Sequence, residues 1–487
     1  ANICFCRDDR RQCFQIVLTI MKPSKILQST ALIAAICKIK AFATNIGSTP
    51  SPDSWKTRVP PLDVSYASTE RSYYGIDANT DENKISLEEW TDRDMYNFQE
   101  WAIDYGVQQM SEMELYTYDG SDWQFISNSY IPANNCVLFV PSNLVFGSIK
   151  VSNEFGDDLK MAEDELLLLD QGTAKRLPLF RLMIKILAEY EKGESSQWFP
   201  WLNSLPRIFY NGVSMTDACF ECLPPCAALL SMNERNTYSR FVNAIRKGFV
   251  PLKPETINDD RVVKWAYNVA LTRFHEVWEP RRQKLIAPMA DMFNHSSEPN
   301  VEITVDKQVN FRVNTIADVP PGTPLTISLG DPTNPTPLFA QYGFLYNDCK
   351  TIFCKAIHLE EEIKDLGYDY KDLLFQTETG EIAPKVWDIF LYKILQDNDL
   401  DAANEFYVAC KTNDEVMKQQ YHDYYFQYTL YDLKNHVYSI LGEVEQLTMK
   451  AQSYDLETHP RVPVIVAHND LVRHTFTMTQ KLLDAME

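Results

Sequence analysis

A stretch near residue 300 carries polar side chains whose types and order could do chemistry. Asn294 and His295 follow a short apolar segment, and a Pro-Gly turn and an apolar strand come after them over residues 320–330. Tyr342 then lies before a glycine in an apolar setting. An Asn-His pair on its own is more often part of a loop or a helix cap. Its weight comes from the turn, the strand and the tyrosine that follow in this order.

A second candidate for chemistry is the cluster Cys219, Cys222 and Cys226, three of the eleven cysteines within eight residues. The spacing could supply three ligands of a metal site, which would need a fourth ligand. No nearby Cys or His completes the set. We therefore favour three buried thiols in an apolar stretch and expect no metal.

Together, the segments over 285–347 resemble the C-terminal half of a SET domain, in the branch of the plant Rubisco large-subunit lysine methyltransferase. Two upstream pieces fit the same branch. One is Ile131-Pro132 before the apolar strand 137–140, and the other is residues 197–206, similar to a W-x-P-Y-L-x-x-L-P element. The resemblance implies S-adenosyl-L-methionine as cofactor and methylation of a protein side chain, with lysine as the leading target.

The resemblance also implies roles for particular residues. Asn294 and His295 would bind the methyl donor with backbone and side chain, and Asp291 matches a donor-contacting aspartate. Arg273 matches the arginine of a Ser-Arg-x-Phe helix, with Thr272 in place of the serine. It would pair with the donor carboxylate, a task suited to a bidentate guanidinium. An ion pair on the helix surface is the alternative for Arg273.

Tyr342 is the catalytic candidate. The attacking lysine must be neutral, a state that an apolar channel and a nearby sulfonium both favour. A tyrosine hydroxyl at the methyl-transfer pore could orient the amine and accept weak C–H···O contacts from the methyl group. The enzyme then mainly holds nitrogen, carbon and sulfur in line. The alternative is a buried tyrosine whose hydroxyl is merely hydrogen-bonded.

Two positions depart from the family pattern. The expected Gly-x-Gly turn near the start of the domain is missing and only Gly120 stands near, although glycine permits the close backbone approach that such a turn needs. Leu329 stands where relatives commonly carry a tyrosine that lines the substrate channel. Both changes leave open a SET-like binding module with lost or reduced catalysis. A histidine-methylating relative in this branch leaves a protein-histidine methyltransferase open as well.

Periodicity indicates the elements that must position these residues. Apolar residues at helical spacing predict a helix over 86–106, beginning at Ser86, and another over 265–278. Residues 114–146 are β-rich, and residues 160–280 are mostly helical. Three more helices are predicted in the C-terminal part, over 386–395, 413–445 and 472–483.

Bulk composition limits the partners. The chain has 487 residues, of which 45% are hydrophobic and 23% charged, a balance typical of globular proteins. Its formal net charge is −21, whereas contact with a phosphate backbone needs clustered Lys and Arg. We expect no nucleic-acid partner. An acidic surface favours a basic partner, such as a protein substrate bearing the target lysine.

Residues 21–43 resemble a targeting leader. Lys22 and Lys25 precede a short apolar core over 31–37, and small residues follow at 41–43. The core is too short to span a membrane, so we expect no stable membrane insertion. The Ala-Phe step is similar to the cleavage point of bipartite plastid leaders, which predicts a plastid location, with a cytoplasmic one as the alternative. A buried N-terminal helix is the structural alternative.

These patterns give an α+β fold and a domain plan. Residues 1–20 are unassigned, and residues 44–82, rich in Ser, Thr, Pro and Asp, form a linker. We expect a SET domain over 95–350, with a mostly-β core, a pseudoknot and a helical insert at about 155–280. An all-helical lobe over 351–487 would bind the protein substrate, as the resemblance implies.

Overall fold

A computed structural model describes residues 85–89, 91–169, 171–278, 282–331, 334–346, 349–353 and 359–486. The unassigned first residues, the predicted leader and the predicted linker lie outside the described residues. Every element described below belongs to one compact unit, residues 81–485.

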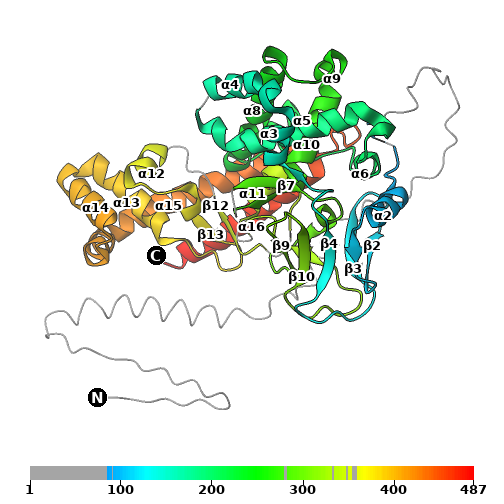
Figure 1. Cartoon of the computed structure of the whole chain (residues 1–487). Coiled ribbons are helices and arrows are strands. Elements are labelled where there is room, and N and C mark those ends of the chain that lie inside the picture. Colours follow the sequence, from blue (N-terminus) through cyan, green and yellow to red (C-terminus); the bar gives the residue numbers. More distant parts are fainter. Residues whose placement is uncertain are drawn as a thin grey trace. The chain divides into compact units, whose positions relative to one another are not determined.

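The β part of the fold is built from short strands, as predicted for residues 114–146. Its members are β1 (Gln108–Gln109), β2 (Met113–Thr117), β3 (Trp123–Ser127), β4 (Cys136–Val140), β5 (Phe146–Gly147), β6 (His275–Val277), β7 (Gln283–Ile286), β8 (Asn294–His295), β9 (Val301–Val305), β10 (Phe311–Thr315) and β11 (Thr326–Ile327). Four of them form an antiparallel sheet in the order β1-β4-β10-β9, and three form a sheet in the order β5-β7-β6. The hairpin β2–β3 and the parallel pair β8–β11 complete the β part (Figure 1).

Alternating burial explains why the central sheet forms. Along β10, Phe311 and Val313 are fully buried while Arg312 is exposed, the period of two expected for a strand with one face on a core. The same strand pairs with β4 on one side and β9 on the other. The buried face belongs to a large apolar cluster that also takes in the helices of the insert.

The helical insert lies between β5 and β6. Its helices are α3 (Ser148–Phe155), α4 (Lys160–Leu169), α5 (Leu177–Lys192), α6 (Phe199–Ser204), α7 (Asp217–Phe220), α8 (Pro225–Lys247), α9 (Pro254–Asn258) and α10 (Asp260–Arg273). Helix α5 packs against α10, and both contribute to the main apolar cluster. The insert is helical as predicted, and its helices run from Ser148 to Arg273.

Two predicted helix boundaries are wrong. The first helix, α2 (Met95–Asp104), begins nine residues after the predicted Ser86, because Asp94 caps it by accepting a hydrogen bond from the Asn97 amide at 3.1 Å. Ser86 instead bonds the Thr91 hydroxyl at 2.9 Å, within a loop. The helix predicted over 265–278 ends at Arg273. Beyond it, β6 pairs with β7, and this pairing overrides the local helical pattern.

The C-terminal lobe is helical, as predicted, with one small sheet in addition. Its helices are α12 (Glu360–Leu366), α13 (Pro384–Asn398), α14 (Leu400–Thr412), α15 (Glu415–Gln452) and α16 (Val462–Asp484), and its strands β12 (Thr351–Phe353) and β13 (Leu374–Gln376) pair with each other. The three helices predicted here are confirmed and are longer than predicted. Helices α15 and α16 pack side by side (Figure 1). Within the described ranges, no helix combines the length and apolar character needed to cross a membrane.

A second apolar cluster links α7, α8 and the C-terminal helices to α11 (Pro335–Tyr342). It contains Cys219 and Cys222 together with Phe339 and Ile465. Cys226 is buried too, so the interpretation of this group as buried thiols is confirmed. In the part of the chain that the structure describes, no group of three or more His, Cys, Asp or Glu could hold a metal ion.

Candidate active site

Asn294 and His295 form β8, which pairs in parallel with Thr326 and Ile327 of β11. The Ser296 amide donates to the Ile327 carbonyl at 3.0 Å and extends the pair by one residue. The hairpin β9–β10 separates the two paired segments along the chain. A parallel contact between such segments is the crossing that the predicted pseudoknot requires.

The ring of His295 is fixed by a backbone donor and by aromatic neighbours. Its Nδ1 accepts a hydrogen bond from the Leu329 amide at 3.1 Å, so the neutral ring carries its proton on Nε2. Tyr346 meets the ring edge-on, with the ring centroids 4.9 Å apart, and Phe344 lies at 5.8 Å. Leu329 therefore serves this site through its backbone, while its side chain packs against the main apolar cluster.

Arg273 ends helix α10 and points at the segment that precedes β8. Its Nη1 donates to the Asp291 carbonyl at 2.6 Å and lies 4.0 Å from the Met292 sulfur. The predicted alternative, an ion pair on the helix surface, is not found for Arg273 among the described residues, because its recorded partners lie inside the fold.

Asp291 is buried in a short 3₁₀ helix, η6 (Ala290–Met292). Its Oδ2 accepts a hydrogen bond from Trp201 Nε1 at 3.0 Å. Through Trp201, the element over residues 197–206 contacts this site. Burial raises the pKa of the Asp291 carboxyl, and the positive charge of Arg273 opposes this shift.

Two buried polar atoms at this point have no hydrogen-bond partner among the described residues: Arg273 Nε and Asp291 Oδ1. Leaving such atoms unpaired costs about 1–3 kcal/mol each, so a site that keeps both is prepared for a ligand. Arg273 Nε belongs to a cationic guanidinium that can donate a hydrogen bond, and Asp291 Oδ1 belongs to a carboxylate that can accept one. Together they fit the zwitterionic amino-acid end of S-adenosyl-L-methionine, with its carboxylate on Arg273 and its ammonium group on Asp291.

Arg93 is a residue of this site that sequence reasoning missed. Its Nε donates to the Ser204 carbonyl at 2.6 Å, its Nη1 to the Ser121 carbonyl at 2.5 Å, and its Nη2 lies 3.8 Å from the Met292 sulfur. Burial lowers the pKa of Arg93 to about 9, and the like charge of Arg273 adds to the effect. The sequence contains no signal for it, because its partners are backbone carbonyls far along the chain.

The turn that Arg93 holds is the β2–β3 hairpin, where the family's Gly-x-Gly pattern is missing. Gly120 has a φ of +78°, and an added Cβ would meet nothing within 4 Å. The glycine therefore serves the turn itself and not a close backbone approach. Asp122 follows, and the Asn294 side chain hydrogen-bonds to its carboxyl. Partial burial raises the pKa of Asp122, and that hydrogen bond opposes the shift.

Tyr342 and Gly343 close helix α11. Asn334 caps the start of this helix, because its side chain accepts a hydrogen bond from the Thr336 amide at 3.0 Å. Gly343 has a φ of +81°, and an added Cβ would lie 2.4 Å from the Tyr210 carbonyl carbon. Only glycine fits there. Close packing against Tyr210 therefore requires a glycine directly after Tyr342.

The Tyr342 hydroxyl has no hydrogen-bond partner among the described residues. Burial raises the pKa of Tyr342, and the positive charge of Arg273 opposes the shift. The Phe344 ring lies 5.8 Å from the His295 ring of β8 and contacts Tyr342 as well, so it links the catalytic candidate to the candidate donor site. The ring of Phe344 lies 5.8 Å from the Tyr342 ring and covers one side of it.

Comparison with known proteins decides the family. The model of the SET domain matches residues 76–330, more than half of the 487 residues. The chain belongs to the SET-domain family. The matched part of this SET domain ends at Gly330, so Tyr342 and the helical lobe lie beyond it.

A curated relative and several solved structures are similar to this SET-domain chain. SET domain-containing protein 4 from Homo sapiens is 24% identical over 183 residues, which cover 34% of this chain and only 41% of that relative. The SET domain of LSMT bound to lysine and AdoHcy has a TM-score of 0.56 at 13% identity, covering 80% of this chain and 91% of that one. Rubisco LSMT bound to sinefungin and monomethyllysine has a TM-score of 0.55 at 13% identity, covering 81% and 92%. At such identities the likeness concerns the fold.

Proposed function

We propose that this SET-domain protein transfers a methyl group from S-adenosyl-L-methionine to a lysine side chain of a protein substrate. The observation that carries the proposal is the pair of unpartnered buried atoms, Arg273 Nε and Asp291 Oδ1, beside Asn294 and His295. The lysine target is supported by structural neighbours whose bound ligands include lysine and monomethyllysine.

The bound donor supplies an electrophilic methyl group on a sulfonium. Arg273 would hold its carboxylate end, and Asp291, oriented by the Trp201 hydrogen bond, would hold its ammonium end. Asn294 and His295 would line the donor from β8, and the Leu329 amide keeps the His295 ring in one orientation. These contacts would fix the donor before the substrate arrives, so that little ordering would remain at the reacting step.

Tyr342 acts on the amine side of the reaction. Because burial raises its pKa, the hydroxyl stays protonated at neutral pH and serves as a neutral hydrogen-bonding group. It can orient the attacking nitrogen while the surrounding rings exclude water. Exclusion of water favours the neutral amine, which is the form that attacks.

The test is methyl transfer by the full chain with Tyr342→Phe. The substitution keeps the ring and its packing, so donor affinity should stay near the wild-type value. Turnover should fall by roughly ten- to a thousandfold, because the amine loses its orientation. Tyr454→Phe is the control, since Tyr454 is half-buried against the second apolar cluster and should leave turnover unchanged. An unchanged rate in Tyr342→Phe contradicts the catalytic role.

One observation favours a second candidate, a SET-like binding module. The side chain of Leu329 cannot donate a hydrogen bond where relatives commonly carry a tyrosine, and it packs against the main apolar cluster. A chain that binds the donor in calorimetry but transfers no methyl group to any protein would support the module. Measurable turnover excludes it.

A further inference from the structure

One face of helix α15 leaves four tyrosine rings in solvent. Tyr424, Tyr428, Tyr431 and Tyr438 follow one another at intervals of four, three and seven residues and so lie along one stripe of the helix. Tyr424 and Tyr428 are 79% and 66% exposed. These four residues are called the tyrosine face below. Other sides of α15 pack against α13, α14 and α16.

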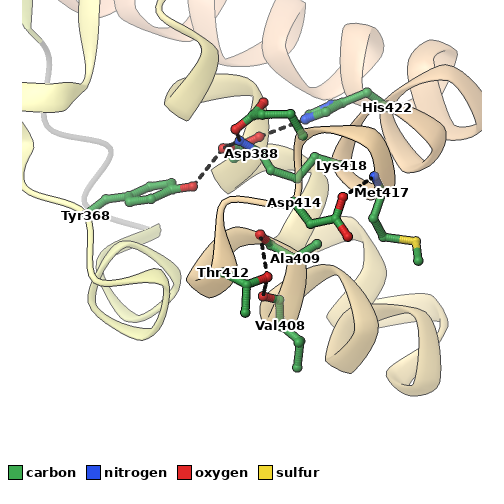
Figure 2. A network of polar contacts seen from close by, with 10 residues as sticks. Tyr368, Asp388, Val408, Ala409, Thr412, Asp414, Met417, Lys418 and His422 are labelled. Atoms are coloured by element: carbon green, nitrogen blue, oxygen red, sulfur yellow. Dashed lines mark hydrogen bonds and ion pairs between the residues drawn. The ribbon is translucent and has the colours of Figure 1, made fainter.

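The start of α15 is anchored firmly, which gives the tyrosine face a rigid base. The buried carboxylate of Asp388, on α13, accepts a hydrogen bond from the Tyr368 hydroxyl at 2.7 Å. It also pairs with Lys418 Nζ at 2.8 Å and lies 2.8 Å from His422 Nε2. Figure 2 shows these groups converging on the carboxylate. Asp388 thereby neutralises the charge of Lys418, which precedes the tyrosine face on α15.

The span of the tyrosine face contains one Lys or Arg, Lys434, and its Nζ pairs with Asp484 at 2.8 Å. From residue 419 to residue 433, α15 contains no Lys or Arg, and it contains Asp423 and Asp432. The hydroxyls of Tyr424 and Tyr428 have no hydrogen-bond partner among the described residues. Electron-rich ring faces next to carboxylates attract Lys and Arg side chains.

We propose that the tyrosine face of α15 docks a Lys- and Arg-rich segment of the protein substrate. The inference rests on the proposed function, because the docked segment belongs to the protein that carries the target lysine. Charge favours this occupant over a second copy of the chain, since two chains of net charge −21 repel each other.

The test uses the full chain and a short fluorescent peptide of alternating lysine and serine, with a glutamate–serine peptide of equal length for comparison. Binding is followed by fluorescence anisotropy without the methyl donor. Each exposed ring should contribute about two- to fivefold to affinity, so Tyr424→Ala/Tyr428→Ala should bind the basic peptide about tenfold more weakly. Tyr424→Phe/Tyr428→Phe keeps both rings and should bind within about twofold of wild type.

Tyr96→Ala/Tyr130→Ala is the matched control, because these two exposed tyrosines lie on other elements. It should bind the basic peptide as wild type does. Equal binding of both peptides by the wild type overturns the proposal, as does undiminished binding by Tyr424→Ala/Tyr428→Ala. Sedimentation that finds a dimer in the wild type and a monomer in that variant, with peptide binding unchanged, assigns the face to self-association instead.

The two proposals fail in different ways. Peptide binding is measured without donor, so a chain that docks the peptide through the tyrosine face but transfers no methyl group contradicts the proposed function only. A chain that methylates a protein equally well with and without Tyr424 and Tyr428 contradicts the docking surface only.

Discussion

Replacement of Arg273 is the most revealing single change at the donor site. Arg273→Ala removes the unpartnered Nε and the hydrogen bond from Nη1 to the Asp291 carbonyl. Hydrogen bonds to a charged group contribute about 1.5–3 kcal/mol, so donor affinity should fall by roughly ten- to 150-fold. Arg273→Lys keeps the positive charge but loses the planar guanidinium. Its donor affinity should therefore lie between those of the wild type and of Arg273→Ala.

Isothermal titration of S-adenosyl-L-methionine into the full chain measures this change. Arg261→Ala is the control on the same helix, because Arg261 is exposed and pairs only with Glu88 at 3.0 Å among the described residues. It should leave the dissociation constant unchanged. The reasoning is refuted by an Arg273→Ala protein that folds and binds the donor as tightly as the wild type does.

Three further predictions address packing, pH and processing. Gly343→Ala should lower the free energy of unfolding in urea by about 2–5 kcal/mol, because the alanine is strained at positive φ and its Cβ collides with Tyr210. Gly120→Ala is the control: its Cβ has no neighbour within 4 Å, so only the backbone strain of about 1–2 kcal/mol remains. Donor affinity should fall as pH is lowered through the raised pKa of Asp291, since the protonated carboxyl loses its attraction for the donor ammonium, and Asp291→Asn should abolish that dependence. Mass spectrometry of native protein should find residues 21–43 removed, and a mature chain that retains them contradicts the leader.

Most residues of the candidate site stand in short, dense motifs that are visible in the sequence. Asn294, His295 and Asp291 lie within five residues of one another, and a strand pair brings their segment to β11. Arg273 sits at the end of a helix whose apolar period is plain in the sequence. The fold class followed from the same motifs together with the helical pattern of the C-terminal part.

The parts that could not be predicted depend on partners remote in sequence. Arg93 is held by the carbonyls of Ser121 and Ser204, and a backbone carbonyl leaves no trace in the sequence of its partner. The residues after Arg273 fit a helical period, but pairing with β7 makes them a strand. Ser86 and Asp94 are both good helix caps, and only the folded chain decides between them.

The most direct test of the central claim is transfer of labelled methyl groups from S-adenosyl-L-methionine into a soluble proteome by the purified full chain, followed by peptide mapping. The account predicts label on lysine within a basic protein segment, and its loss with Tyr342→Phe. Label on histidine alone contradicts the lysine assignment. No incorporation above the enzyme-free blank, with the donor bound in calorimetry, contradicts methyl transfer itself.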